Sequence, residues 1–434
     1  ATAQAQHPID RFLTSKLESK VVLDPNDGID GPQDLDFNRL PGRERELWVI
    51  NREGDEAGGS IVILYDAGKS TEWSEYRRDS HSDHFMVNPT AIAMGANGNF
   101  ANVAELLNTI GHADVIFMGP TLWTTDTSIF ARENQNDWEH GQLLGSHSDM
   151  LHESPFSMGI AADTGNVYWV FDGHHGNIYR YDFKTPHGYG EDDHSDGIVY
   201  QYDVSVERTE DLPSHMVLDE ATGWLYVVDN GNSRIFRMQT RSGERGDDLF
   251  DENEPLAEYA QMNDIIVQVF ETGSPRLSGI DFIDGRLIVS NNSNGEIRVY
   301  NTTTSTPTYL GSIATNDDGI RGVKFGPDSA IWYVNYDENT VVRLAAGELL
   351  AVGEEGVSIR NTIYPSPARS MVNVEAAAGV QEIRVVNSLG TVVQTILQPE
   401  SRIQIDVKAL PNGVYYCQFV SGEGVRYERF VVSR

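Results

Sequence analysis

Several histidines in this chain have the placement expected of a metal site shared by separate strands. His152 and His215 each lie directly before a short run of β-forming residues, and His84 lies in the approach to another run. Neutral imidazoles from different strands form a borderline-soft site for zinc or another divalent transition metal. One interpretation is therefore that His152 and His215, with His84 as a third, are ligands of one ion. The alternative is that they cap turns or line a polar channel.

Charged residues near the same strand beginnings could complete a catalytic set. Glu153 follows the first of these histidines and would be the general base. Arg276 and Arg321 precede two further β-forming runs, and either guanidinium would orient an anionic group of a substrate. A metal ion with an open coordination position would act as a Lewis acid beside them.

An acidic loop offers a second candidate site. Asp192, His194 and Asp196 alternate along the loop and are followed by Gly197. Carboxylates at alternate positions before a glycine resemble a calcium loop of the Asp-x-Asp-x-Asp-Gly kind. Histidine is a poor calcium ligand, so the alternative is a solvated acidic loop between strands.

An internal repeat would position all of these residues. The clearest copy, residues 223–237, reads Gly-Trp-Leu-Tyr-Val-Val-Asp-Asn-Gly-Asn-Ser-Arg-Ile-Phe-Arg, and related copies begin at Gly165, Gly285, Ala330 and, more faintly, Glu46. In each copy a strand, an Asp/Asn/Gly turn and a second strand follow one another, and another short strand precedes them. Repeats of about 50 residues with four short strands predict propeller blades.

The blades resemble those of NHL-type six-bladed β-propellers, particularly in the segment HMVLDEATGWLYVVDNGNSRIFRM that begins at His215. The blade with this histidine is also similar to the lyase half of peptidylglycine amidating enzymes, which implies zinc held by histidines from separate blades. Propellers bind ligands at the mouth of the central channel, where the inner strands begin. That position would bring the candidate residues together.

The segment from Tyr364 onward describes a small all-β module. It contains Pro365-Ser-Pro, Asn387-Ser-Leu-Gly, Leu410-Pro-Asn-Gly-Val-Tyr and three alternating apolar and polar runs. These parts resemble, in order, the type A C-terminal sorting domain of the type IX secretion system of Bacteroidetes-like bacteria. Ser366 departs from the asparagine that is frequent there. The resemblance implies type IX secretion machinery as a partner and a secreted or cell-surface location.

The sequence therefore predicts an all-β protein, a six-bladed β-propeller with four-stranded antiparallel blades plus a small C-terminal β-sandwich. The alternative is a propeller of seven blades, because the second blade is poorly defined. The expected parts are an N-terminal extension and closing segment over 1–32, the propeller over 33–351, a linker over 352–361 and the sorting domain over 362–434.

Composition restricts the partners. The net charge is −33, so nucleic acid is not an expected partner, because phosphate binding needs clustered basic residues. Lysine is rare among the 32 basic residues, which favours a surface adapted to concentrated salt. The single Cys417 excludes an internal disulfide and is expected to be a small buried hydrophobe.

We expect no membrane-spanning helix in this sequence, and we do not expect its first residues to be a signal peptide. No apolar run reaches the roughly 18 residues that a bilayer span requires. The first residues, ATAQAQHPID, lack the basic and apolar regions of a signal peptide, so we expect a processed N-terminus.

Two functions from different classes remain. The first is an exported binding or structural scaffold with bound calcium, which would contact a surface glycan, another protein or its own copies. The second is a zinc-like metal-dependent lyase or hydrolase with its site at the propeller axis. No Gly-x-Ser-x-Gly, Walker, dinucleotide or His-Glu-x-x-His motif occurs. The scaffold is favoured because no complete catalytic set can be assembled.

Elemental analysis of the purified protein separates these two functions. For the enzyme we expect a stoichiometric transition metal that is lost in the His152→Ala, His215→Ala double variant. Calcium alone would favour the scaffold, and the absence of any transition metal would rule out the enzyme.

Overall fold

The protein, a computed structural model, folds into two compact units, Ala1–Leu350 and Ala351–Arg434. Strands dominate both units, so the all-β prediction is confirmed. The residues that the structure describes are 7–54, 57–108, 116–132, 145–191, 193–250, 255–347, 362–376, 380–387, 391–421 and 424–433.

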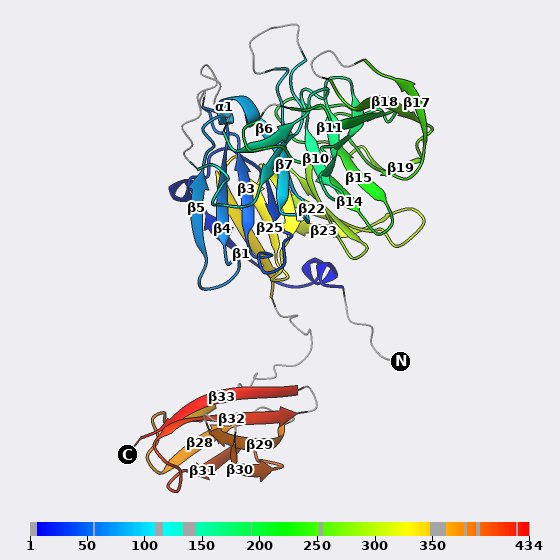
Figure 1. The fold of residues 1–434 in the computed structure, drawn as a ribbon. Coiled ribbons are helices and arrows are strands. Elements are labelled where there is room, and N and C mark those ends of the chain that lie inside the picture. Colours follow the sequence, from blue (N-terminus) through cyan, green and yellow to red (C-terminus); the bar gives the residue numbers. More distant parts are fainter. Residues whose placement is uncertain are drawn as a thin grey trace. The chain divides into compact units, whose positions relative to one another are not determined.

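Six sheets, here called sheets I to VI, make up the described part of the first unit (Figure 1). Three of them use four consecutive antiparallel strands. Sheet I contains β2 (Pro32–Phe37), β3 (Leu47–Asn51), β4 (Ser60–Tyr65) and β5 (Trp73–Arg77). Sheet II contains β6 (Pro89–Met94), β7 (Asn99–Ala104), β8 (Thr121–Thr124) and β9 (His147–Met150). Sheet V contains β20 (Leu277–Ile283), β21 (Arg286–Asn291), β22 (Glu296–Asn301) and β23 (Thr308–Ala314).

The other three sheets include strands from elsewhere in the chain. Sheet III contains β10 (Gly159–Ala162), β11 (Val167–Asp172), β12 (Asn177–Asp182), β13 (Ile198–Tyr202), β18 (Glu258–Asn263) and β17 (Glu244–Asp248). Sheet IV contains β14 (Met216–Asp219), β15 (Trp224–Asp229), β16 (Arg234–Gln239) and β19 (Val267–Thr272). Sheet VI contains β24 (Ile320–Phe325), β25 (Ile331–Asn335), β26 (Thr340–Ala346) and β1 (Leu17–Leu23).

One hairpin belongs to a sheet other than its neighbours in the chain. β17 and β18 lie in sequence between the third and fourth strands of sheet IV. However, β18 pairs in parallel with β13 of sheet III, from Ile198↔Glu258 to Tyr202↔Met262. Sheet III is therefore wider than the four-stranded blade that the repeat predicts.

The first strands of the six sheets form a closed ring. β2 contacts β6, β6 contacts β10, and the contacts continue through β14, β20 and β24 back to β2. Four-stranded antiparallel sheets that radiate from a common axis form a β-propeller. The inner strands therefore line the axis.

The core of the described propeller is divided into clusters that each lie between two neighbouring sheets. In β3, Trp48 and Ile50 pack against sheet II, whereas Leu47 and Val49 pack against sheet VI. Successive side chains of a strand point to opposite faces. A middle strand that is buried on both faces therefore needs an apolar residue at nearly every position, which explains the continuous apolar runs of the repeat.

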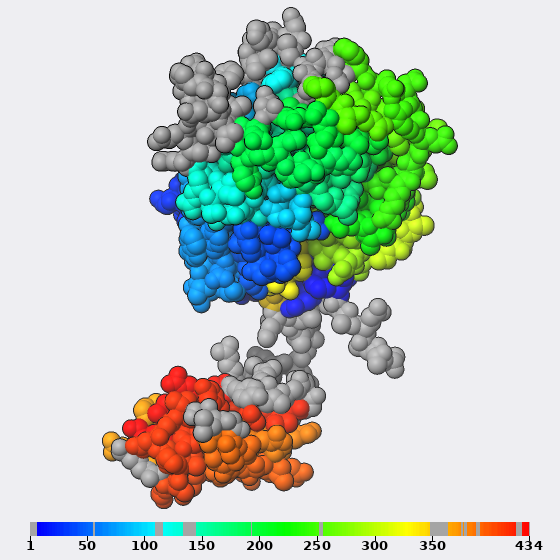
Figure 2. Space-filling model, in the orientation of Figure 1, coloured from blue at the N-terminus to red at the C-terminus, as the bar shows by residue number. Residues whose placement is uncertain are grey.

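The N-terminal segment closes the ring. β1 pairs antiparallel with β26 as the outer strand of sheet VI. Before it, the 3-10 helix η1 (Ile9–Leu13) places Ile9 and Phe12 in the core between sheets V and VI. Arg286 donates two hydrogen bonds, 2.7 and 2.8 Å long, to the carboxylate of Asp10. The dark blue N-terminal residues lie against the yellow residues of the last sheets in Figure 2.

The remaining helices of the described chain are short. They are η2 (Pro25–Asp27), which follows β1, and α1 (Ser82–Phe85), which precedes β6. Among the described residues, no helix combines the length and the apolar character that a membrane span requires.

The second unit consists of two sheets that share one core. One sheet contains β27 (Thr362–Tyr364), β28 (Met371–Glu375) and β31 (Arg402–Asp406). The other contains β30 (Val392–Leu397), β29 (Val380–Asn387), β32 (Gly413–Ser421) and β33 (Gly424–Val432). Cys417 lies in the common core, and burial raises the pKa of its thiol to about 12. A thiol of this kind is unreactive.

Ring closure by the N-terminal segment can be tested with one substitution. We expect Phe12→Ala to lower the free energy of unfolding by about 3 to 5 kcal/mol, because it leaves a cavity in a packed core. The ring is 3% exposed and belongs to the cluster that joins sheets V and VI.

The control is Val21→Ala, because this β1 side chain is 53% exposed. It should change the free energy of unfolding by no more than about 0.5 kcal/mol. Urea denaturation of both variants measures the difference, and equal effects would contradict a closing role for the N-terminal segment.

Candidate functional site

A cavity of about 250 Å³ lies on the propeller axis. All six inner strands contribute to its lining, which includes Asp36, Ala93, Met94, Ile160, Ala161, Met216, Val217, Asp281 and Lys324. Most of the wall from sheets II, III and IV is apolar, whereas sheets I, V and VI contribute charges. Charged groups therefore come mainly from sheets I, V and VI, with Glu220 as the one charged lining residue that follows a strand of sheet IV.

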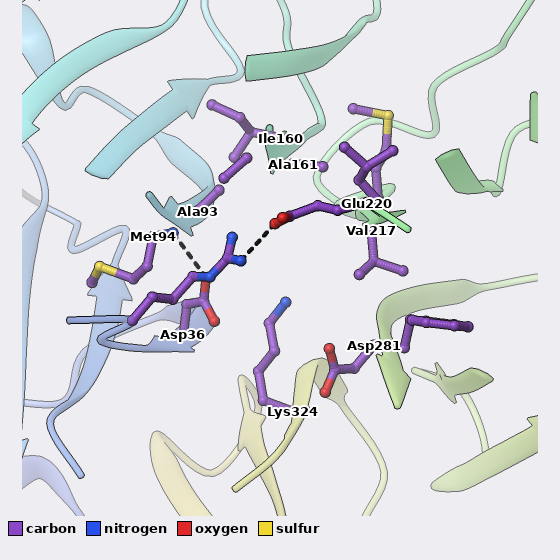
Figure 3. A pocket seen from close by; sticks show the side chains of 14 residues that line it. Asp36, Ala93, Met94, Ile160, Ala161, Val217, Glu220, Asp281 and Lys324 are labelled. Atoms are coloured by element: carbon purple, nitrogen blue, oxygen red, sulfur yellow. Dashed lines mark hydrogen bonds and ion pairs between the residues drawn. The ribbon is translucent and has the colours of Figure 1, made fainter. Parts of the chain in front are cut away.

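Lys324 of β24 is the central charged group of this cavity and lies between Asp36 and Asp281 (Figure 3). Its ammonium makes no hydrogen bond or ion pair to another residue that the structure describes. Burial alone would lower the pKa of Lys324, but the nearby carboxylates, chiefly Asp36 and Asp281, outweigh burial and raise it. The ammonium is therefore charged and keeps its donors available to the cavity.

The two carboxylates beside this lysine are held by backbone hydrogen bonds. Asp36 accepts from the backbone N–H of Met94 at 2.9 Å, and Asp281 accepts from that of Phe325 at 2.8 Å. Burial raises the pKa of Asp281 to about 6. The backbone bonds fix the orientation of both groups toward the axis.

An ion pair crosses the mouth of the cavity. Arg39, just after β2, donates to Glu220, just after β14, at 2.5 Å (Figure 3). A recess of about 610 Å³ adjoins the cavity and shares Asp36, Arg39, Asp281 and Lys324 with it. Three half-buried aromatic rings line this recess: Phe37, Phe282 and Phe325.

Two of the predicted site residues lie nearer the beginnings of the inner strands, where they have structural partners. His215 Nε2 donates to the carbonyl of Thr90 at 3.0 Å, and its Nδ1 lies 3.5 Å from Asp34. Burial lowers the pKa of His215. Arg321 bonds to Gln33 and stacks on the ring of Tyr336 at 3.5 Å. Burial lowers the pKa of this arginine to about 10.

Three other predicted residues have local contacts. His152 stacks on Phe117, with ring centroids 3.9 Å apart. His84 packs edge-on against Phe85 at 4.5 Å. Arg276 is exposed and donates to Asn292 at 2.5 Å.

Glu153 is buried in a backbone conformation that is uncommon for its residue type. Its φ is 90°, in the left-handed region that favours glycine. Its carboxylate adds to the forces that raise the pKa of His175, although the hydrogen bond to Asp172 is the largest of these.

The structure does not bring the three histidines of the expected axial metal site together. Among the described residues, the ligand atoms of Asp149, His187 and Asp196 form the one group of at least three that lie within 4.8 Å of one another. His84, His152 and His215 are not in this group.

The acidic loop is part of this other group. Asp196 supplies one member, and His194 Nδ1 bonds to Asp149 Oδ1 at 2.9 Å. Asp192 lies outside the described residues. The sequence did not indicate Asp149, which comes from the last strand of sheet II. The only signal for His187 was its position at the start of the loop.

The comparison with family models concerns the second unit. Residues 362–433 match the family described as the secretion system C-terminal sorting domain. The predicted sorting tail is confirmed, and it marks the chain for type IX export to the cell surface or the medium in Bacteroidetes. No curated protein shows significant similarity to the chain.

Solved structures resemble the chain only distantly. An auxiliary nutrient binding protein from Bacteroides ovatus is 12% identical, with a TM-score of 0.48 over 77% of this chain and 78% of that one. PorZ, a surface component of the type IX secretion system of Porphyromonas gingivalis, is 12% identical, with a TM-score of 0.38 over 93% and 60%. Streptogramin B lyase is 13% identical, with a TM-score of 0.41 over 78% and 99%. Similarities this low carry no conclusion about activity.

The buried carboxyl of Asp281 gives a pH-dependent prediction. The pKa of this carboxyl is about 6 in the folded protein and 3.8 ordinarily. As the pH falls, Asp281 is therefore protonated in the folded state before it is protonated in the unfolded state. The negative charge of Asp281 lowers the free energy of unfolding above pH 6, and this effect disappears as the pH falls toward 4. We expect Asp281→Asn to raise the free energy of unfolding by about 1 to 3 kcal/mol at pH 7 and to have almost no effect near pH 4.

Denaturant unfolding between pH 4 and pH 8 measures this difference. Asp284→Asn is the control, because it removes the same charge from an exposed turn. A benefit of Asp281→Asn that is independent of pH, or equal to that of the control, would contradict the assignment.

Proposed function

We propose that the exported propeller is an extracellular binding protein for a neutral carbohydrate, which occupies the axial cavity and the adjoining recess. The observation that carries this proposal is the charged Lys324 ammonium, which faces the cavity without a partner among the described residues. A half-buried donor of this kind is available to a ligand.

The polar groups of the cavity suit hydroxyl groups. A hydroxyl can accept a hydrogen bond from the lysine and donate one to a carboxylate. Lys324 offers the donors, and Asp36 and Asp281 offer the acceptors on either side. Hydrogen bonds to charged partners are stronger than those between neutral groups. A ligand with several neighbouring hydroxyls would use all three residues at once.

Charge favours a neutral ligand over an anionic one. The two carboxylates beside Lys324 offset its positive charge, and the whole chain carries a net charge of −33. A field of this sign repels polyanions. The half-buried rings of Phe37, Phe282 and Phe325 in the recess add apolar surface for the carbon skeleton of a sugar.

A metal-dependent lyase or hydrolase at the axis has less support. His215 is engaged by Thr90 and Asp34, and Arg321 is engaged by Gln33 and Tyr336. Neither side chain has the exposure that a substrate would need. We therefore favour the binding scaffold over the enzyme and specify its ligand as a carbohydrate.

Isothermal titration with neutral gluco-, manno- and xylo-oligosaccharides tests the proposal. We expect one of these series to bind and Lys324→Met to weaken binding at least about 10-fold, which corresponds to one lost hydrogen bond to a charged group. Lys69→Met is the control, because it makes the same change on an exposed residue that pairs with Asp66.

A second variant keeps the test informative if Lys324→Met does not fold. Arg39→Gln changes a side chain that is 37% exposed at the mouth of the cavity, so it should fold and still weaken binding. Failure of all three oligosaccharide series to bind, or equal binding by both variants and the parent protein, would refute the proposal.

A further inference from the structure

Three side chains from two sheets converge away from the axial cavity. Asp149 lies in β9 of sheet II, whereas His187 and Asp196 lie in the loop between β12 and β13 of sheet III. His187 Nε2 is 3.4 Å from Asp196 Oδ1 and 3.6 Å from Asp149 Oδ2. Metal–ligand distances of about 2.0 to 2.1 Å in a tetrahedral zinc site place ligand atoms about 3.3 Å apart. The observed separations are close to this spacing.

The three converging atoms lack hydrogen-bond partners. Asp149 Oδ2, His187 Nε2 and Asp196 Oδ1 are all buried atoms without a partner. The side chain of Asp149 is 0% exposed, so this oxygen does not face bulk solvent. A buried carboxylate oxygen without a partner is costly.

A protonated His187 would explain the group less well than a cation. An imidazolium between two carboxylates would form hydrogen bonds of about 2.9 Å. The distances of 3.4 and 3.6 Å are too long for such bonds. They leave room for an ion between the three atoms.

We propose that Asp149, His187 and Asp196 bind a divalent transition-metal ion, with Zn²⁺ as the expected ion, between sheets II and III. One imidazole nitrogen and two carboxylate oxygens suit zinc and its neighbours, whereas calcium and magnesium prefer oxygen ligands alone. Asp196 is 39% exposed, so solvent can supply the remaining ligand. This site is separate from the axial carbohydrate site.

Residues around the three ligands support their geometry. His194 bonds to Asp149 Oδ1 at 2.9 Å, which orients the carboxylate and leaves Oδ2 for the ion. Groups that orient a ligand in this way commonly tune metal affinity. Two backbone hydrogen bonds also join the loop to β9. His187 N–H donates to Ser148 O at 3.2 Å, and Gly190 N–H donates to His147 O at 2.8 Å.

The ion would fasten the acidic loop to the neighbouring sheet. A divalent charge would offset the two carboxylates, of which Asp149 has its pKa raised by burial. The propeller contains no cysteine, because the single Cys417 lies in the tail. A metal bridge between two blades would provide the cross-link that a disulfide provides in other exported proteins.

Zinc titration of the full chain tests this site. We expect the chelator-treated protein, without a histidine tag, to bind one Zn²⁺ per chain and to unfold at a higher temperature with Zn²⁺ than without it. His187→Gln and Asp196→Asn should each weaken binding more than 10-fold and abolish the thermal shift. His194→Gln should weaken binding about 10-fold, as expected for a residue that orients a ligand.

The control is Asp193→Asn in the same loop. Asp193 is exposed, and its carboxylate accepts from Ser195 instead of facing the group. Zinc binding by this variant should equal that of the parent protein. Melting without metal verifies that each variant folds. Absence of zinc binding, binding of Ca²⁺ but not Zn²⁺, or equal zinc binding by His187→Gln, Asp196→Asn and the parent would overturn the proposal.

Discussion

The structure depends on the burial of both faces of every propeller sheet against two neighbours. A sheet of this kind is not stable alone, because either face would leave a row of large apolar side chains in water. The arrangement is complete only when the last sheet also meets the first. The Leu47 and Val49 side of β3, packed against sheet VI, is where this closure occurs. The N-terminal strand and helix η1 then join the start of the propeller to its last blades.

Ring closure also creates the chemistry of the axis. Six inner strands converge there, so polar side chains near their ends meet in a confined space. Lys324 and the carboxylates of Asp36 and Asp281 stabilise one another in this position, as the raised pKa of the lysine indicates. The same crowding explains why Asp281 has a pKa of about 6. Enclosing these charged groups thus costs stability, but it also leaves oriented hydrogen-bonding groups in the axial cavity.

The spaces between blades have a different character. They are filled mainly by apolar clusters, and larger polar contacts form where a loop extends from one sheet to the next. The loop between β12 and β13 does this when it follows β9 and brings His187 and Asp196 to Asp149. The β17–β18 hairpin also connects two blades. It lies in the sequence between two strands of sheet IV, yet it pairs with sheet III. Both connections join blades through the backbone as well as through side chains.

The amino-acid sequence by itself determined the all-β class, the repeated strands and the sorting tail, because these depend on local patterns. Turn residues between apolar runs and the order of short motifs after Tyr364 are visible without any contact. Tertiary structure decided which polar residues meet. Histidines 84, 152 and 215 share a similar place before strands, yet side-chain direction and local partners separate them. No motif or regular spacing in the sequence relates Asp149 to His187, and nothing in the sequence distinguishes Lys324 from a surface lysine. Only the closure of the ring and the path of one loop place these groups together, and both depend on contacts between residues far apart in the chain.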